Sequence, residues 1–350
     1  MRALASIVLP PLGALYGAIT RARTAFYEAG LVPVYKLDKP VISVGNITAG
    51  GTGKTPLVEW LTRVLFREGR RVCILTRGYG RVDSRQRVVV SDADTVLATA
   101  DQAGDEALLL AEQLRGMAVV ISDGDRVAAG RWALRRFDID TFILDDGFQH
   151  LRLRRDLNIV TIDATNPWGG GHLLPYGRLR EPLSSLRRAD CIVMTRVEQV
   201  RDTLDVVDRL GRLSGNRPVF LSQMHARGFS LLGKPKVAAS GISLKNPILA
   251  FCGVGNPEAF FNCIRSQGYE LALTRAFPDH HSYKWQELNS LMEDAKLLGV
   301  RNLVTTAKDA VKLTSFDFEI PCHVLDIEVV MEDAEPLVEL IRASLAAHSD

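Results

Sequence analysis

The sequence contains few cysteines, and none of them has the spacing of a metal site or a redox pair. Five are present among 350 residues, and each lies in an apolar run: Cys73, Cys191, Cys252, Cys263 and Cys322. This odd number without a C-x-x-C pair argues against a disulfide scaffold or zinc site, and indicates buried thiols in a reducing compartment. The chain also lacks low-complexity tracts and an internal repeat period, so we expect a globular protein.

Neither sign of charge dominates, because 43 Lys and Arg residues face 41 Asp and Glu residues and leave a net charge of +2. This balance conceals a local excess of arginine in one central stretch: Arg152, Arg154, Arg155, Arg178, Arg180, Arg187 and Arg188. A basic cluster of this kind suits an anionic partner. A solvated basic surface would have the same composition, so both interpretations stay open.

A long apolar stretch occurs at the N-terminus, where residues 3–20 carry no formal charge. A helix that spans a bilayer needs about 20 apolar residues, so this length is marginal. Pro10 and Pro11 are predicted to break a helix at its middle. No A-x-A cleavage site follows, which argues against a secretory signal. We expect a short amphipathic segment in the membrane interface; the alternative is a terminal helix packed on the protein's own core.

Along the rest of the chain, apolar runs typical of buried strands alternate with helix-like segments. Strands are predicted at 41–44, 71–76, 117–122, 142–145, 157–163, 191–195 and 218–223, and, after a polar stretch at 228–247, at 248–252, 271–277, 303–306 and 323–330. This alternation indicates an α/β fold with a mostly parallel sheet covered on both faces. We predict an N-terminal membrane-associated segment (1–30), a larger α/β domain (31–230) and a smaller C-terminal α/β domain (231–350).

The segment directly after the first predicted strand has the layout of a nucleotide-phosphate cradle. It consists of Thr48, Ala49, Gly50, Gly51, Thr52, Gly53, Lys54 and Thr55, and it leads into an apolar helix. Glycines let successive backbone N–H groups turn toward phosphates, and the helix N-terminus adds its positive dipole end. Lys54 would reach the β- and γ-phosphates, and the Thr55 hydroxyl would bind Mg²⁺. Because Thr48 replaces the usual first glycine, the segment is a variant P-loop.

Two pairs of adjacent acidic residues have the pattern of metal ligands or of a general base. Asp145 and Asp146 end a predicted strand, where one carboxylate would hold Mg²⁺ against the phosphates. A strand-end aspartate that caps the next turn is the alternative. Asp105 and Glu106 open a predicted helix, where one acid would accept a proton from a substrate hydroxyl and the other would assist the metal. The alternative is that the two acids only interact favourably with the positive end of the helix dipole.

Two further segments bear on the chemistry. His280 and His281 follow a strand of the smaller predicted domain, and the absence of nearby cysteines makes a poor zinc site. A histidine that orients a carboxylate across a cleft is chemically reasonable, and a surface turn is the alternative. Residues 195–198, Thr-Arg-Val-Glu, bear only a weak resemblance to the [NT]-K-x-D element that selects guanine. GTP is therefore not expected.

An ordered set of motifs runs through nearly the whole chain: Ser43–Asn46, Gly50–Pro56, Thr76–Gly80, Gly104–Glu106, Ser122–Gly124, Asp145–His150, Leu174–Pro175, Leu179–Pro182, Phe277–His280 and Lys308–Lys312. Together they resemble the tetraacyldisaccharide 4'-kinase family, the lipid A 4'-kinases of Gram-negative bacteria. The P-loop of this family shares the departure at Thr48. Because the set is ordered, it is far more specific than any single motif.

The resemblance implies phosphorylation of the 4'-hydroxyl of a lipid A precursor, an acylated glucosamine disaccharide 1-phosphate, with ATP and Mg²⁺. It implies a P-loop kinase domain and a smaller lobe that close over the nucleotide. It also implies a location at the cytoplasmic face of the bacterial inner membrane, peripheral or N-terminally anchored, and no nucleic-acid partner. Carried to matching positions, it makes Asp105 the catalytic base with His280 and Lys54 as catalytic groups, places Thr55, Glu106, Asp145 and Asp146 around the metal, and assigns Arg77, Gln149 and Arg178 to substrate binding.

Two other functions stay open at this point. One is a soluble P-loop GTPase or metallochaperone, and the other is a membrane adaptor that binds nucleotide only as a switch. The first predicts guanine preference and metal-binding Cys and His clusters, and this sequence lacks such clusters.

Overall fold

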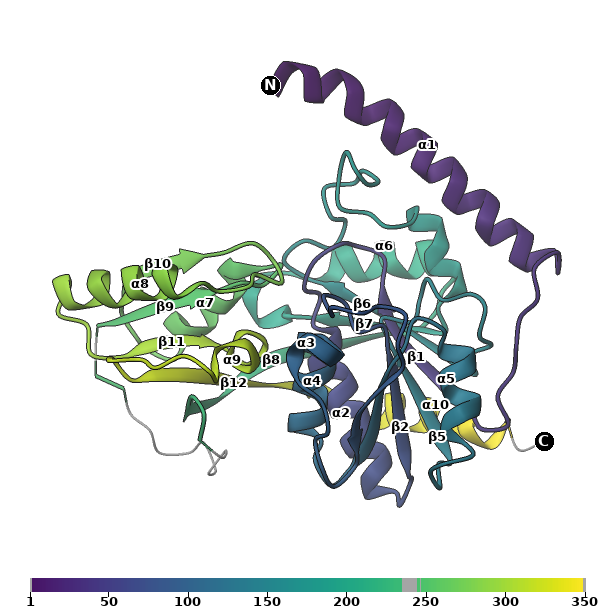
Figure 1. The fold of residues 1–350 in the computed structure, drawn as a ribbon. Helices are drawn as coiled ribbons and strands as arrows, with labels where there is room; N and C mark the ends of the chain where they lie inside the picture. The colour runs from purple at the N-terminus through teal and green to yellow at the C-terminus, as the bar shows by residue number, and fades with distance from the viewer. Residues whose placement is uncertain (1, 235–243, 246, 349–350) are drawn as a thin grey trace.

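The computed structural model describes residues 2–234, 244–245 and 247–348. It consists of a larger and a smaller lobe side by side (Figure 1). The strands of the larger lobe are β1 (Val41–Asn46), β2 (Val72–Thr76), β3 (Val88–Asp92), β4 (Ala118–Ser122), β5 (Thr141–Asp145), β6 (Leu157–Asp163) and β7 (Cys191–Thr195). Those of the smaller lobe are β9 (Ile248–Cys252), β10 (Leu271–Ala276), β11 (Leu303–Thr306) and β12 (Cys322–Met331), and β8 (Val219–Leu231) runs between the lobes.

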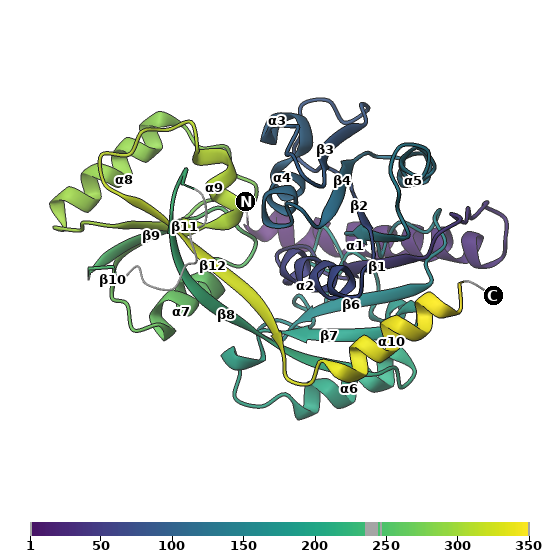
Figure 2. The same ribbon diagram turned by 90° about the horizontal axis from the view of Figure 1, so that it is seen from below.

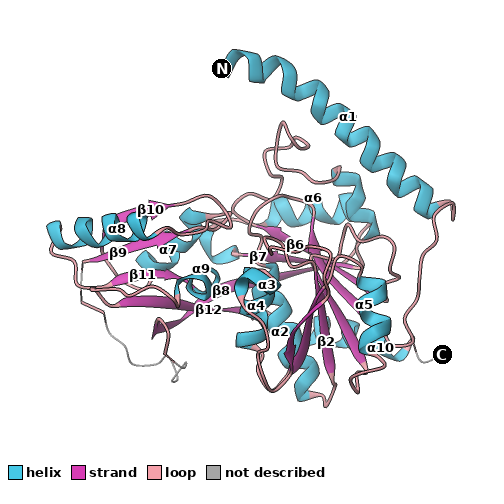
Figure 3. Cartoon of the chain, in the orientation of Figure 1, coloured by secondary structure: helices cyan, strands magenta, loops and turns pink. Residues whose placement is uncertain are grey.

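Helices cover both faces of these strands, as Figure 3 shows. In the N-terminal part they are α1 (Arg2–Glu28), α2 (Lys54–Arg67), α3 (Ala100–Ala103), α4 (Asp105–Gln113), α5 (Arg126–Ala133) and α6 (Leu204–Ser214), with short 3₁₀ turns η1 (Leu183–Arg188) and η2 (Val197–Gln199). In the C-terminal part they are α7 (Pro257–Ser266), α8 (Trp285–Leu297), α9 (Ala307–Leu313) and α10 (Glu335–Ala346).

Within the described residues, all twelve strands belong to one sheet, in the order β10-β9-β11-β12-β8-β7-β6-β1-β5-β2-β4-β3. Neighbouring strands are parallel except for the β3–β4 and β8–β12 pairs. Every residue of β1, β2 and β4 to β7 is buried, which explains why these segments are continuous apolar runs. The predicted mostly parallel α/β sheet is confirmed, and β3 is an edge strand that the sequence analysis missed.

The two lobes are joined through β8, which pairs in parallel with β7 through Val219–Leu221 and antiparallel with β12 through Ser222–Leu231. Figure 2 shows β8 and β12 crossing together from one lobe to the other. The predicted strand at 218–223 is therefore too short, and the stretch 228–247 begins inside a strand. Residues 235–243 and 246 lie outside the described residues. The division into units 1–30, 31–230 and 231–350 stays a prediction.

The strand order places a crevice at the carboxyl end of β1. β1 lies between β5 and β6, and the chain fills the sheet on one side of β1 before it crosses to the other. In open α/β sheets, ligands bind outside the carboxyl ends of the strands at such a switch point. The loops that follow β1, β2, β5 and β6 all begin there, and they contain most of the residues that the sequence analysis selected.

Helix α1 contradicts one sequence-based prediction. It runs without interruption from Arg2 to Glu28 through Pro10 and Pro11, although these prolines were predicted to break it. Each proline removes one backbone hydrogen bond. Figure 1 shows that much of this helix stands away from the body of the larger lobe.

The accessible side of α1 carries a stripe of exposed apolar side chains. Leu12, Leu15, Ile19 and Phe26 are all exposed, and their spacing of three, four and seven residues places them on one face of the helix. None of the helices in the described part of the chain is long and apolar enough to cross a membrane.

Candidate active site

The P-loop lies between β1 and α2, and its glycines are required by the backbone path. Gly53 precedes the first residue of α2 and has a φ of 80°, a left-handed conformation that costs a residue with a Cβ atom about 1 kcal/mol or more. A Cβ atom on Gly53 would also collide with the side chain of Met224. The loop therefore places Lys54 and Thr55 in the first turn of α2, as the sequence predicted.

The carbonyl groups of the P-loop are held by donors from the surrounding protein. Asn46 donates to the Thr48 carbonyl (2.8 Å) and Arg178 to that of Ala49 (3.1 Å). Arg196 donates to the Gly51 carbonyl (2.9 Å) and Thr195 to that of Thr52 (2.9 Å). A backbone nest for an anion needs its carbonyls turned away so that its N–H groups can face the ligand. These four bonds supply that condition.

The segment 195–198, which the sequence analysis compared with a guanine-selecting element, has a structural role here. Thr195 and Arg196 brace the P-loop, and Arg196 also pairs with Asp163 at 2.6 Å. The Glu198 carboxylate accepts a hydrogen bond from the Met224 backbone (3.1 Å). Glu198, the acid that would have to recognise guanine, thus already accepts a hydrogen bond from the protein's own backbone.

Lys54 contacts one of the two strand-end acids. Its Nζ lies 3.4 Å from the Asp146 carboxylate, which also receives two hydrogen bonds from Arg180 at 2.8 and 2.9 Å. Burial alone would raise the pKa of Asp146, but the charges of Lys54 and Arg180 outweigh it and hold that pKa well below its usual range. Asp146 is therefore ionised and already paired with two cations.

Asp145 has the opposite character. It is fully buried at the end of β5, and one of its oxygens accepts a hydrogen bond from Thr76 (3.0 Å). Burial and the nearby charges of Glu106 and Asp146 raise the pKa of Asp145 above its ordinary value, although Lys54 opposes them. A concentration of negative charge on hard oxygen donors fits a divalent cation such as Mg²⁺.

The donor set fits magnesium better than a transition metal. No group of three or more His, Cys, Asp or Glu side chains within the described residues is arranged to hold an ion by itself. Mg²⁺ commonly binds through one or two carboxylates together with substrate phosphates and water. Asp145 and Glu106, with Thr55 at the start of α2, are residues of the required kind.

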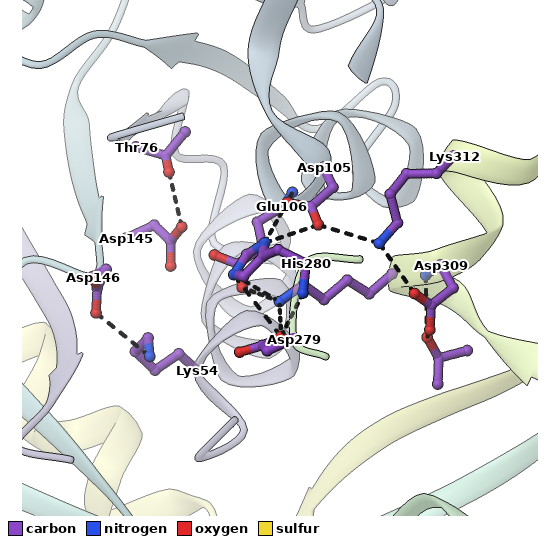
Figure 4. Close-up of polar contacts among 12 residues, drawn as sticks. Lys54, Thr76, Asp105, Glu106, Asp145, Asp146, Asp279, His280, Asp309 and Lys312 are labelled. Carbon is purple, nitrogen blue, oxygen red and sulfur yellow. Dashed lines mark hydrogen bonds and ion pairs between the residues drawn. The ribbon is translucent and has the colours of Figure 1, made fainter. Parts of the chain in front are cut away.

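The catalytic pair that the family resemblance implied is assembled across the lobes (Figure 4). Nδ1 of His280, in the loop after β10, lies 3.1 and 3.0 Å from the two carboxylate oxygens of Asp105, at the start of α4. Burial would raise the pKa of Asp105, but the hydrogen bond from His280 and the charges of Lys308 and Lys312 together lower it. Asp105 is therefore a buried carboxylate in its charged form.

Helix α9 of the smaller lobe adds two lysines that the sequence analysis did not assign to the site. Lys308 Nζ lies 3.0 Å from Glu106 and 3.1 Å from both Asp279 and His280. Lys312 Nζ lies 3.7 Å from Asp105 and 3.1 Å from the buried Asp309. Because these lysines are four residues apart, they share one face of α9. That spacing in the motif 308–312 was the available sequence signal.

The remaining predicted residues lie at different places. Arg178 bridges the lobes, since it donates to Ala49 of the P-loop and to the Gly255 carbonyl (2.9 Å). Gln149 donates to the carbonyl of Asn46 (2.9 Å) and to Glu181 (3.0 Å), so its amide group braces the loop behind the P-loop. Arg77 is exposed in the loop after β2. Their assignment to substrate binding stays a prediction.

Much of the arginine-rich stretch is used for internal contacts rather than for a free basic surface. Arg180 pairs with Asp146, and Arg188 pairs with Glu181 and lies over the Phe148 ring. Arg155 donates to the His150 carbonyl (2.8 Å). These contacts support the loops behind the P-loop, so the local excess of arginine is in good part structural.

A cavity of about 280 Å³ opens beside the P-loop between the lobes. Its walls come from the P-loop, the end of β6 and the loop after it, η2, and the first turns of α7 with the residues before them: Thr48–Thr52, Asp163, Thr165, Asn166, Gly169, Arg178, Gln199, Gly255, Asn256, Glu258, Ala259 and Asn262. Asn256 closes one side, since it donates to Asp163 at 3.0 Å. The cavity is continuous with the phosphate cradle.

The fold and this site define the class: a two-lobed P-loop protein with a carboxylate–histidine pair at the lobe junction. The family model for tetraacyldisaccharide-1-P 4'-kinase matches residues 5–346. A tetraacyldisaccharide 4'-kinase of Geobacter sulfurreducens is 40% identical, covering 96% of this chain and 92% of that protein. A second tetraacyldisaccharide 4'-kinase, from Pelobacter propionicus, is 37% identical, and the match covers 97% of this chain and 92% of that protein. The chain belongs to the tetraacyldisaccharide-1-P 4'-kinase family.

A solved structure agrees with this assignment. The structure of LpxK from Aquifex aeolicus in complex with ATP has a TM-score of 0.76 and 32% sequence identity, and the match covers 96% of this chain and 98% of that one. The resemblance stated from the motifs is confirmed, and the GTPase alternative is not supported.

Proposed function

We propose that this protein transfers the γ-phosphoryl group of ATP to the 4'-hydroxyl of a tetraacyldisaccharide 1-phosphate, a lipid A precursor. The observation that carries this proposal is the hydrogen-bonded pair of Asp105 and His280, contributed by different lobes beside the P-loop. A nucleotide switch or an adaptor has no need for a charged carboxylate paired with histidine at the lobe junction. A kinase that must activate an alcohol does need one.

The P-loop binds the triphosphate in this reaction. Its N–H groups, with their carbonyls tied back by Asn46, Arg178, Arg196 and Thr195, surround the phosphate oxygens. Lys54 neutralises charge on the β- and γ-phosphates, and Arg180 holds Asp146 when Lys54 turns to the nucleotide. Phosphoryl transfer depends mainly on such positioning and charge neutralisation.

Asp105 takes the proton of the acceptor alcohol. The 4'-hydroxyl oxygen forms the new bond to the γ-phosphorus, the bond from that phosphorus to the β–γ bridging oxygen breaks, and ADP leaves. The hydroxyl proton passes to the Asp105 carboxylate, which His280 orients through Nδ1. General-base assistance of this kind typically accelerates a reaction about 10²- to 10⁴-fold.

Magnesium is expected at the buried acids. When bound, the ion would neutralise charge on the β- and γ-phosphates. Asp145, Glu106 and the Thr55 hydroxyl would hold it. Asp146 is already paired with two cations, Lys54 and Arg180, whereas Glu106 is paired with Lys308 through one oxygen, Oε1.

We further propose that the protein works at the cytoplasmic face of the bacterial inner membrane, with α1 lying in the interface. A multiply acylated acceptor stays in the bilayer, and the exposed stripe on α1 supplies apolar contact area. No nucleic acid enters this proposal. We expect replacement of Leu15 and Ile19 by Asn to weaken binding to phosphatidylethanolamine–phosphatidylglycerol vesicles about 10- to 100-fold.

Leu297, which is 85% exposed at the far end of α8, provides the control for that experiment. Leu297→Asn removes a comparable exposed leucine and should leave sedimentation with vesicles unchanged. If both variants bind vesicles as the parent does, α1 is not the membrane contact.

The direct test of function is product analysis. Purified protein is incubated with ATP, Mg²⁺ and the detergent-dispersed disaccharide 1-phosphate, and the added phosphate is located by mass spectrometry and ³¹P NMR. A new phosphomonoester at the 4' position is expected. Nucleotide hydrolysis that is independent of the lipid and prefers GTP would reject the proposal, and nucleotide binding without any transfer would favour an adaptor.

A further inference from the structure

The contacts of Lys308 determine where the proton on His280 resides. The ammonium group has three N–H donors and no acceptor. It has three neighbours at hydrogen-bond distance: Glu106 Oε1 at 3.0 Å, Asp279 Oδ1 at 3.1 Å and His280 Nε2 at 3.1 Å. The side chain is only 16% exposed, so water does not substitute freely for these partners.

Lys308 is charged in this environment. Its Nζ forms ion pairs with the carboxylates of Glu106 (3.0 Å) and Asp279 (3.1 Å), and these favour the ammonium form. Since the ammonium can only donate, Nε2 of His280 must accept, and it therefore carries no proton. The imidazole then holds its proton on Nδ1, which faces both oxygens of Asp105 and donates to them.

We propose that Lys308 is a positioning residue that fixes the proton of His280 on Nδ1. This inference deepens the proposed kinase function and rests on it for its consequence. With its Nε2 lone pair engaged, His280 cannot take the substrate proton, so that task is left to Asp105. Without Lys308, no donor would face Nε2, and the ring would no longer be held in its Nδ1-protonated form. A ring with its proton on Nε2 would present a lone pair to the Asp105 carboxylate and would no longer orient it.

The other groups around His280 do not determine which ring nitrogen carries the proton. Tyr79 lies against the imidazole ring at 4.7 Å between centroids and contributes packing. Lys312 lies on the far side of Asp105, 3.7 Å from its carboxylate, and has no contact with Nε2. Asp279 Oδ1 is 4.0 Å from Nε2, beyond hydrogen-bond distance, and would favour a proton there rather than oppose it. The Lys308 ammonium is the group that opposes it.

Lys308→Met tests the proposal in the full-length protein. Histidine side chains are labelled with ¹⁵N, and long-range ¹H–¹⁵N spectra at neutral pH report the protonation of each ring nitrogen, with His280 identified by comparison with His280→Gln. The parent protein should show a neutral, Nδ1-protonated ring. In Lys308→Met, the proton should shift wholly or in part to Nε2.

Two variants serve as controls. Lys308→Arg keeps a cationic donor without an acceptor and should preserve the Nδ1 proton. Lys312→Met removes a lysine of similar burial one turn further along α9, and it should leave the His280 spectrum unchanged. An imidazolium or an Nε2-protonated ring in the parent overturns the proposal, and this measurement does not depend on whether Lys308→Met folds. Retention of the Nδ1 proton in folded Lys308→Met overturns it as well.

Kinetics supply a second readout. We expect Lys308→Met to lower kcat about 10²-fold and to leave the KM for ATP nearly unchanged. A changed Mg²⁺ requirement with an unchanged His280 spectrum would assign Lys308 to Glu106 instead and reject the proposal. Because the spectra need no turnover, failure of the kinase assay and failure of this inference are distinguishable.

Discussion

The two halves of the active site are built in different ways. In the larger lobe, the phosphate cradle is made of backbone from eight contiguous residues, and four of its carbonyls are tied to fixed donors. In the smaller lobe, the contribution consists of side-chain charges on α9 and on the loop after β10. These side chains reach across the lobe junction to the acids at the start of α4.

This difference separates binding from chemistry. A backbone nest can hold a triphosphate mainly through the larger lobe, because the four donors that fix its carbonyls all belong to that lobe. The proposed base, by contrast, is contacted by His280, Lys308 and Lys312 of the smaller lobe, and these contacts lower its pKa against the effect of burial. We therefore propose that nucleotide binds mainly to the larger lobe and that contact between the lobes completes the group that activates the alcohol.

The sharpest test of this separation is Asp105→Asn. We expect kcat for phosphate transfer to fall about 10³-fold, because the amide keeps the shape but cannot take the proton. The Kd for ATP should change less than about threefold. Transfer is followed with radiolabelled ATP, and binding by calorimetry. Asp101→Asn, an exposed acid four residues earlier, is the matched control. Transfer at the parental rate would show that Asp105 is not the base.

Gly53→Ala tests the other half. The added Cβ atom would force a residue with a φ of 80° into strain and would press on Met224, so the nest should distort. We expect the Kd for ATP to rise about 10- to 100-fold, with a smaller effect on transfer at saturating ATP. Gly211→Ala, on the open side of α6, controls for expression and folding. Unchanged ATP affinity would mean that the cradle does not depend on this conformation.

The same contrast explains what the sequence could predict. The P-loop, the strand-end acids and the parallel sheet are encoded in contiguous residues, so their patterns were readable without the structure. The pairing of Asp105 with His280 spans 175 residues and followed only from the family resemblance. Sequence spacing carries no information about which loops of two lobes meet.

Two features could not be interpreted fully from the sequence. The excess of arginine was compatible with an anionic partner or a solvated surface, and the structure shows that Arg180 and Arg188 pair with Asp146 and Glu181 inside the protein. The composition of a sequence gives the number of charged residues but does not show which residue each one contacts. Likewise, Pro10 and Pro11 were weighed by the hydrogen bonds they remove. The helix continues through them where it stands away from the larger lobe.

The smallest expected effect is on the stability of the fold in acid. It shows whether the ion pairs of Asp146 with Lys54 and Arg180 contribute to the free energy of unfolding. Lys54 and Arg180 depress the pKa of Asp146 below its ordinary value of 3.8. A depressed pKa gives stability that is complete above the unfolded value and is lost as the pH falls through the folded one. We therefore expect the parent protein to lose about 1 kcal/mol more than Asp146→Asn between roughly pH 4 and pH 2, since partly exposed ion pairs contribute on that order.

Urea unfolding at a series of pH values measures this difference. Asp138→Asn is the control, because Asp138 pairs with Arg71 on the surface and is 80% exposed. Its acid dependence should follow that of the parent, since exposed pairs contribute little. If Asp146→Asn shows the same acid dependence as the parent, the cluster of Asp146 with Lys54 and Arg180 serves nucleotide binding and adds nothing measurable to the fold. The division between a larger lobe that binds and a smaller lobe that completes the chemistry would then be sharper still.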